Sequence, residues 1–150
     1  LFRSPHNIIN SLYLTPEKLE QLVKERYERY EQVKANEQMA EEYLTEDADI
    51  VLVAYGASSR VARSAVNKAR EKGIKAGLVR PITLWPFPTQ ALNRAASHAK
   101  NFLVVEMSMG QMVDDVKLAI DCKVPVHFYG RTGGMIPTPA EVLEQIEALL

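Results

Sequence analysis

The sequence has few of the residues that build covalent or metal-bound frameworks. It contains one cysteine, Cys122, among 150 residues. A single cysteine excludes an internal disulfide, and it cannot hold an iron–sulfur cluster, which usually needs four thiolates. His6, His98 and His127 have no partner at metal-ligand spacing. The sequence therefore predicts neither a disulfide scaffold nor a metal centre, and it fits a reducing, cytoplasmic location.

Long apolar runs and an excess of one charge are also missing. The apolar runs fall far short of the about 20 residues that a membrane-spanning helix needs, and the first residues show no secretory signal. Eighteen basic and nineteen acidic residues give a formal net charge of −1. Neither nucleic acid nor an anionic membrane is therefore an expected partner. The chain starts at Leu1 and not at Met, so we expect a piece of a longer polypeptide.

The clearest positive signal is a buried strand followed by a tight turn and a helix. Residues 49–55 are almost entirely apolar, and Gly56 ends the run. Two serines then open an amphipathic helix over residues 59–72, which Gly73 stops. This pattern is the first half of a βαβ unit, a fold element whose working loops lie at the carboxyl ends of the strands.

The rest of the sequence alternates strands with helices. Further strands are expected at about residues 75–80, 102–106 and 124–129, and helices at about residues 89–99, 110–121 and 139–150. Thr138 and Glu141 form a full capping box before the last helix, and Pro125 indicates that the last strand starts late or lies near an edge. Alternation with short connections predicts an α/β fold of three layers, with a mostly parallel sheet covered on both faces.

The amino-terminal part differs in composition from the rest. Residues 1–14 indicate an irregular lead-in, and Thr15 with Pro16 starts a charged helix that runs to about Asn36. A narrow apolar stripe on this helix suits an arm that lies on another domain or subunit. The alternative is a solvated helix packed on its own domain. Helix propensity alone would extend the helix through residues 39–44.

Two strand ends carry candidate functional residues. Residues 56–59 could bind an anion at a helix N-terminus, although a serine that caps the helix is the ordinary interpretation. Glu106 ends a strand and is followed by Gly110 and Gln111. Its carboxylate could act as an acid, a base or a hydrogen-bond acceptor. The alternative for Glu106 is an acid at a helix N-terminus or an interface residue.

Other residues have weaker signals. Residues 130–134 include Arg131 and could bind a phosphate or carboxylate, or could simply be a turn towards the capping box. Trp85 lies among prolines, which favours an interface anchor or a core plug over a ligand stack. We expect Cys122 to be a small buried residue, and His127, which alternates within a strand, to be satisfied structurally. The sequence has no nucleophile elbow and no Ser/His/Asp set in a known order, so it assigns no catalytic residue.

Four segments taken together resemble one family. They are residues 47–56, 78–88, 105–112 and 130–134. The string RPITLWPFP (residues 80–88) lies in the second segment, and VVEMSMGQM (residues 104–112) covers the third. They resemble the carboxy-terminal, transketolase-like domain of the alpha subunit of 2-oxoacid:ferredoxin oxidoreductases. The resemblance implies a five-stranded sheet whose first strand, at residues 39–44, is short and antiparallel. It also implies a domain over residues 39–150, preceded by a lead-in and linker helix over residues 1–38.

The same resemblance implies the activity of the complete enzyme. Such an enzyme oxidatively decarboxylates a 2-oxoacid, and a branched-chain acid such as 2-ketoisovalerate is the implied substrate. Thiamine diphosphate, Mg²⁺ and iron–sulfur clusters are its cofactors, coenzyme A receives the acyl group, and ferredoxin receives the electrons. The resemblance places these cofactors outside this chain, on another domain, a thiamine-binding beta subunit and a ferredoxin-like iron–sulfur subunit.

The resemblance further implies that this domain assembles an oligomeric complex, shapes the rim of its active-site cleft and carries no catalytic residue. The positions expected at that rim or at a subunit contact are Trp85, Phe87, Glu106, Gly110, Gln111 and Arg131. One alternative is the equivalent domain of a transketolase or a 2-oxoacid dehydrogenase. Another is a free-standing signalling or nucleotide-binding domain. A receiver would need an acidic pair and an acceptor aspartate at strand ends where this chain has Gly56 and Glu106.

Overall fold

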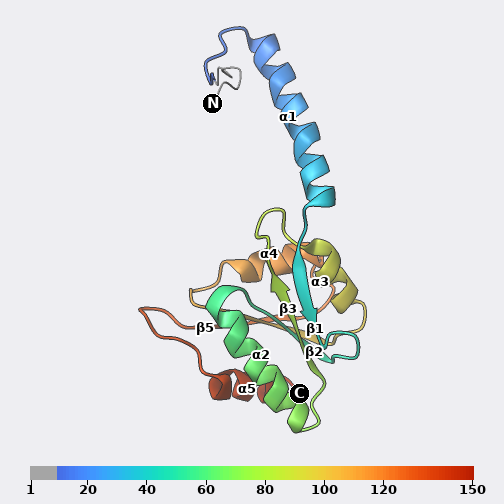
Figure 1. Cartoon of the computed structure of the whole chain (residues 1–150), viewed down its shortest axis with the longest axis vertical. Helices are drawn as coiled ribbons and strands as arrows, with labels where there is room; N and C mark the ends of the chain where they lie inside the picture. The colour runs from blue at the N-terminus through green and yellow to red at the C-terminus, as the bar shows by residue number, and fades with distance from the viewer. Residues whose placement is uncertain (1–9) are drawn as a thin grey trace, which may run out of the picture. The chain divides into compact units, whose positions relative to one another are not determined.

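The computed structural model describes residues 10–150, which form two units with the division after Asn36 (Figure 1). Most of the expected lead-in lies outside the described residues, and residues 10–15 form no helix or strand. α1 (Pro16–Asn36) follows. The N–H of Leu19 donates to the carbonyl oxygen of Thr15 at 3.1 Å, so the helix begins where the Thr15–Pro16 pair predicts.

α1 is a charged helix in which no residue is buried. Ion pairs one turn apart, such as Lys24 with Glu20 at 3.0 Å, run along it. The rings of Tyr27 and Tyr30 in its apolar stripe lie with their centroids 5.9 Å apart. Contact of this stripe with another domain or subunit stays a prediction. Within residues 10–150, no helix combines the length and the apolar character that crossing a membrane requires.

The second unit is built on a five-stranded sheet with the order β1-β3-β2-β4-β5. Its strands are β1 (Ala40–Tyr43), β2 (Ile50–Val53), β3 (Ala76–Pro81), β4 (Asn101–Glu106) and β5 (Val126–Gly130). β2, β3, β4 and β5 run parallel, and β1 pairs antiparallel with β3. The predicted sheet, mostly parallel with a short antiparallel first strand, is confirmed. β5 lies at an edge, as Pro125 indicated.

In β1, tertiary contacts outweigh the helix propensity of the sequence. The N–H of Met39 donates to Thr83 Oγ1 at 3.0 Å, and Glu41 lies opposite Arg80 in the sheet, with an ion pair of 3.0 Å between them. These pairings with β3 and the loop after it hold residues 40–43 extended. The extension of the helix through this segment is therefore wrong, and the strand implied by the family resemblance is confirmed.

Helices cover both faces of the sheet, two on each face (Figure 1). One face carries α2 (Gly56–Glu71) and α5 (Pro139–Ala148), and the other carries α3 (Thr89–Ala96) and α4 (Met112–Ala119). Successive residues of β2 serve opposite cores, because side chains alternate along a strand. Val51 and Val53 pack beneath α3 and α4, whereas Ile50 and Leu52 pack beneath α2 and α5. The predicted three-layer α/β/α architecture is confirmed.

The connection from β1 to β2 passes close to the backbone of β3 at Gly77. A Cβ at this position would lie 2.6 Å from the carbonyl oxygen of Leu44 and 3.0 Å from the Cβ of Ala48. Arg70 of α2 holds the same connection, since its guanidinium donates to the Leu44 carbonyl at 2.8 Å and to Asp47 at 2.7 Å. A residue without a side chain is therefore needed in β3 at this crossing.

Candidate functional site at the carboxyl edge of the sheet

The strand order produces a switch point between β2 and β4. The chain passes from β2 through α2 to β3 on one side, whereas β4 pairs with the other side of β2. Open α/β sheets bind ligands in the crevice at the carboxyl ends of the strands on either side of such a point. Here a hollow of about 220 Å³ is lined by residues 55–58 after β2 and residues 106–108 at the end of β4.

α2 begins at Gly56, earlier than the predicted residue 59. Gly56 has φ +57°, which glycine adopts without strain and which turns the chain from β2 straight into the helix. Tyr55 is at the N-cap position, and its side chain makes no capping hydrogen bond. The Ser59 hydroxyl instead donates to the Gly56 carbonyl at 2.7 Å. The interpretation of a serine cap is therefore wrong, because the serines lie inside the first turn.

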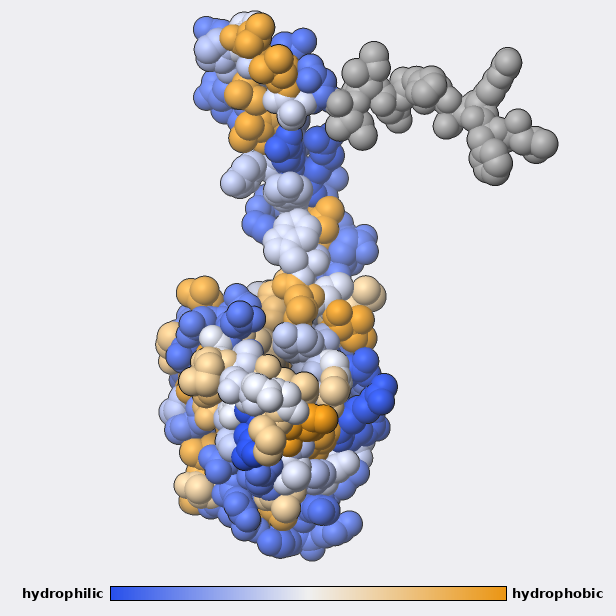
Figure 2. Space-filling model, turned by 90° about the vertical axis from the view of Figure 1, so that its left-hand side faces the viewer, coloured by the Kyte–Doolittle hydropathy of each residue, from blue (hydrophilic) through white to orange (hydrophobic). Residues whose placement is uncertain are grey.

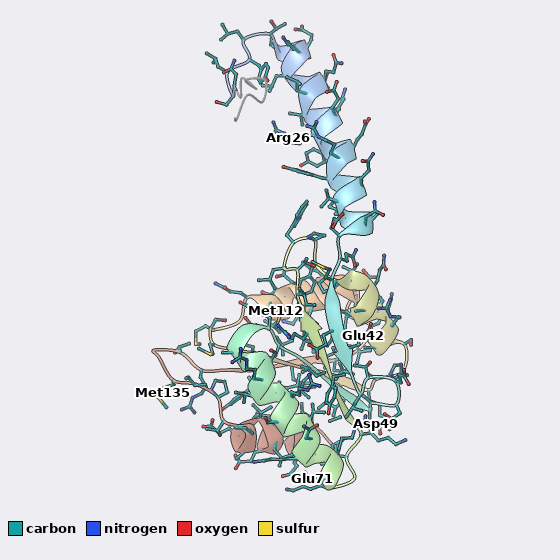
Figure 3. The ribbon with its side chains drawn as sticks, in the orientation of Figure 1. Arg26, Glu42, Asp49, Glu71, Met112 and Met135 are labelled. Carbon is teal, nitrogen blue, oxygen red and sulfur yellow. The ribbon has the colours of Figure 1, made fainter. Side chains whose placement is uncertain are left out.

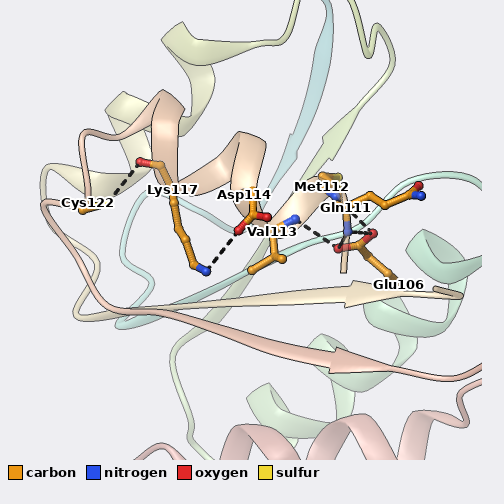
Figure 4. A network of polar contacts seen from close by, with 7 residues as sticks. All are labelled: Glu106, Gln111, Met112, Val113, Asp114, Lys117 and Cys122. Carbon is orange, nitrogen blue, oxygen red and sulfur yellow. Dashed lines mark hydrogen bonds and ion pairs between the residues drawn. The ribbon is translucent and has the colours of Figure 1, made fainter. Parts of the chain in front are cut away.

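Glu106 is a buried carboxylate that binds the N-terminus of α4 (Figure 4). It is 3% exposed, and it accepts hydrogen bonds from the N–H groups of Gln111 and Met112 at 3.1 Å and of Val113 at 3.0 Å. The Ser108 hydroxyl donates a further bond at 3.0 Å. These four donors occupy the carboxylate, which supports the helix-terminal alternative for Glu106 and leaves it little capacity for acid–base chemistry.

The loops after β4 and β5 lie against each other. The N–H of Arg131 donates to the Glu106 carbonyl at 3.2 Å. A Cβ on Gly130 would lie 2.4 Å from both the Ser108 carbonyl oxygen and the Phe128 ring, and one on Gly110 would lie 3.5 Å from that ring. The structure thus brings together Glu106, Gly110, Gln111 and Arg131, four of the six positions expected at the rim.

Arg131 is used within the fold. Its guanidinium donates to Glu141 at 2.9 Å, and Glu141 completes the predicted capping box with the Thr138 N–H at 2.8 Å. The Thr138 N–H, the Thr138 hydroxyl and the charge of Arg131 lower the pKa of Glu141. This pairing favours the turn interpretation of residues 130–134 over an anion-binding loop. Met135 lies at the projecting tip of the same connection (Figure 3).

Trp85 and Phe87, the other two expected rim positions, belong to the loop between β3 and α3. The Thr83 hydroxyl donates to the Pro86 carbonyl at 2.8 Å and helps to shape this loop. Phe87 is half-buried and packs on the core beneath α3 and α4. Trp85 is 56% exposed, so it is not a core plug.

The sequence patterns did not predict the exposed apolar side chains at this edge. Met109 is 83% exposed and Met107 is 46% exposed. Met135 and Ile136 are exposed in the loop between β5 and α5. Figure 2 faces the side from which that loop projects, and it shows apolar residues interspersed among polar ones. One signal in the sequence could have predicted them: these apolar residues stand in glycine-containing loops directly after strands.

A larger hollow of about 580 Å³ lies at the opposite, amino end of the sheet, between the connection from β1 to β2 and α3. Several of its polar side chains have partners within the fold. Arg94 forms an ion pair with Glu42, and His98 Nε2 lies 2.6 Å from the Thr45 carbonyl oxygen. Size therefore does not identify the functional end, and the smaller switch-point crevice is the better candidate.

Two residues with expected structural roles have different outcomes. His127 Nε2 lies 3.2 Å from Asn101 Oδ1, which confirms that His127 is satisfied within the fold. Cys122 is exposed in the turn after α4, with φ +52° and Sγ 3.7 Å from the Lys117 carbonyl oxygen (Figure 4). The prediction of a buried Cys122 is wrong because the chain leaves the core at this turn.

The chain is similar to subunits of 2-oxoacid oxidoreductases. It is 46% identical over 143 residues to ketoisovalerate oxidoreductase subunit VorB of Methanothermobacter marburgensis, covering 95% of this chain and 40% of that subunit. It is 40% identical over 102 residues to 2-oxoglutarate synthase subunit KorA of the same organism, covering 68% of this chain and 27% of that one. The chain thus spans about two fifths or less of the length of these relatives.

Two solved structures share the fold. The 2-oxoglutarate:ferredoxin oxidoreductase from Magnetococcus marinus matches 91% of this chain and 24% of its own chain, with a TM-score of 0.71 and 19% identity. A split-gene transketolase matches 73% of this chain and 40% of its own, with a TM-score of 0.62 and 20% identity. These identities establish the fold alone. Residues 48–142 match the family model for pyruvate:ferredoxin oxidoreductase core domain II, so the chain belongs to the 2-oxoacid:ferredoxin oxidoreductase family.

Proposed function

We propose that this chain is the carboxy-terminal domain of the alpha subunit of an oxidoreductase for a branched-chain 2-oxoacid such as 2-ketoisovalerate. In the complete reaction, one 2-oxoacid, one coenzyme A and two oxidised ferredoxins give one acyl-coenzyme A, one carbon dioxide, one proton and two reduced ferredoxins. The 46% identity to a ketoisovalerate oxidoreductase subunit supports this substrate class. The 40% identity to a 2-oxoglutarate synthase subunit, over a shorter stretch, supports the competing one.

The role of the domain is subunit assembly, and one observation carries it. The carboxyl-edge loops use their polar groups internally and expose apolar side chains. Glu106 and Arg131 are occupied within the fold, whereas Met107, Met109 and Met135 are exposed. Such apolar tips are typical of surfaces that become buried in a complex. The rim positions that we propose are Trp85, Phe87, Glu106, Gly110, Gln111 and Arg131.

The donor atoms of this chain do not fit the cofactors of the family. Cys122 provides one thiol where a cluster usually needs four. The described part of the chain has no group of three His, Cys, Asp or Glu side chains placed to hold a metal ion. The 220 Å³ hollow is smaller than the about 300–1,000 Å³ of pockets that enclose drug-sized ligands. The 580 Å³ hollow at the amino end is within that range, but its Arg94 is paired with Glu42 within the fold. We propose that thiamine diphosphate, Mg²⁺ and the clusters reside on a beta subunit and a ferredoxin-like subunit of a cytoplasmic oligomer.

Affinity purification from the native cells tests both the assembly and the substrate. A tag after Leu150 should recover the chain together with a thiamine-binding subunit and an iron–sulfur subunit. The recovered complex should reduce ferredoxin with 2-ketoisovalerate in a reaction that requires coenzyme A. The rates with pyruvate and 2-oxoglutarate, measured in parallel, should be lower.

The outcomes separate the parts of the proposal. A higher rate with 2-oxoglutarate would overturn the branched-chain assignment and leave the assembly role intact. Recovery of the chain without other subunits would contradict the assembly role. Turnover by the purified chain alone would contradict the placement of the cofactors on other subunits.

A further inference from the structure

The switch-point crevice lies between two helix N-termini that differ in how their N–H groups are satisfied. At α4, the carboxylate of Glu106 accepts from three N–H groups of the first turn. At α2, the N-cap residue Tyr55 provides no side-chain hydrogen bond. The first N–H groups of a helix have no partner within the helix, so those of residues 56–58 can bind an acceptor that enters the crevice.

Ser58 is an independent sign of such a ligand. It is 5% exposed and lines the crevice, and its hydroxyl takes part in none of the hydrogen bonds formed among residues 10–150. The neighbouring hydroxyls are both used: Ser59 donates to Gly56, and Ser108 donates to Glu106. No fully buried side-chain nitrogen or oxygen of the described residues lacks a hydrogen-bond partner, so the Ser58 hydroxyl oxygen keeps some accessible surface. The Ser58 hydroxyl is therefore available to a group bound in the crevice.

The backbone at the start of α2 is also accessible. A Cβ placed on Gly56 would meet no atom within 4 Å, whereas one on Gly130 would lie 2.4 Å from its neighbours. Gly130 is thus required by the packing of the two loops. Open space at Gly56 instead lets a ligand approach the N–H groups of the first turn.

We propose that this crevice binds one oxyanionic group, a phosphate or a carboxylate of a small metabolite, on the N–H groups of residues 56–58 and the Ser58 hydroxyl. N–H donors and the positive end of the α2 dipole both favour negative oxygen. The adjacent Glu106 carboxylate is offset by its own four donors and by the dipole of α4. The 220 Å³ hollow equals about seven water volumes of about 30 Å³ each, enough for one hydrated anionic group.

Amide NMR of the 150-residue chain tests this site. Inorganic phosphate and, in a second arm, acetate are titrated at constant ionic strength with sodium chloride as the balancing salt. We expect saturable shifts of the amide signals of residues 56–58, with one dissociation constant for all three. The arm with the lower dissociation constant identifies the preferred group. Ser58→Ala should raise that constant about tenfold, since it removes one hydrogen bond to a charged group.

Ser64→Ala is the matched control, because it makes the same change on the exposed side of the same helix, where the hydroxyl bonds only the Arg60 carbonyl. It should leave the dissociation constant unchanged, and well-dispersed spectra verify that both variants fold. Linear shifts without saturation, shifts spread over the surface lysines, or equal constants for Ser58→Ala and the unmodified chain would each overturn the proposal. None of these outcomes depends on subunit recovery or substrate choice, so this experiment and the test of the proposed function can fail independently.

Discussion

The two ends of the sheet use their side chains in opposite ways. At the amino end, charged groups pair across elements: Arg70 with Asp47 at 2.7 Å, and Lys100 with Asp49 at 2.9 Å. At the carboxyl end, the polar groups are held inside the loops, and apolar residues such as Met109 face outward. The side chains of these pairs are 24–74% exposed, and ion pairs near the surface contribute little to stability. The exposed apolar residues of the carboxyl end suit it to bind a partner subunit.

The largest expected effect comes from Glu106, because it organises the carboxyl end. Glu106→Ala removes a buried acceptor from three N–H groups and the Ser108 hydroxyl, and it should lower the free energy of unfolding by about 3 kcal/mol. Urea unfolding at neutral pH measures this. Glu144→Ala, an exposed glutamate of α5, is the control and should change the value by less than about 0.5 kcal/mol. A similarly small change for Glu106→Ala would refute its role as an anchor.

Two glycines extend the comparison between the ends. Gly77→Ala at the amino end and Gly130→Ala at the carboxyl end both place a methyl group within 2.6 Å of a backbone carbonyl oxygen. Each should lower the free energy of unfolding by about 2 kcal/mol, as overpacking does. Gly130→Ala should also displace the loop after β4 and weaken subunit recovery, whereas Gly77→Ala should not. Equal recovery of partner subunits by the two variants would contradict the proposal that only the carboxyl end binds them.

The sequence predicts best what is local and periodic. The apolar run before Gly56 and the Thr138–Glu141 capping box specify a strand and a helix start from neighbouring residues, and both are confirmed. The role of Glu106 depends on how the loop after β4 folds back, so the sequence left an acid–base role and a structural role open. The exposure of Cys122 depends on the left-handed backbone of Asp121 and Cys122, which no local sequence pattern predicts.

A smaller effect, with the same dependence on pH, is expected at both ends. The hydrogen bond from Arg70 lowers the pKa of Asp47, and hydrogen bonds from Thr138 lower the pKa of Glu141. A carboxylate with a lowered pKa stabilises the fold above its unfolded value, about 3.9 for Asp and 4.3 for Glu. That stabilisation is lost as pH falls through the folded pKa.

Asp47→Asn and Glu141→Gln should therefore each destabilise the chain at pH 6–7, and the difference from the unmodified chain should shrink below about pH 4. Urea unfolding at a series of pH values measures the difference. If the difference in the free energy of unfolding grew as the pH fell, the predicted direction of the pH dependence would be wrong. Glu144→Gln should show no such dependence.

The central claim is that the carboxyl end is the docking surface, and paired surface substitutions test it most directly. The double variant Met109→Asp, Met135→Asp changes two exposed residues of that end, and Leu44→Asp makes the same kind of change at the amino end. Neither should alter the free energy of unfolding by more than about 0.5 kcal/mol. We predict that the tagged double variant loses its partner subunits in affinity purification while Leu44→Asp retains them. Retention by the double variant, or loss from Leu44→Asp alone, would contradict the account.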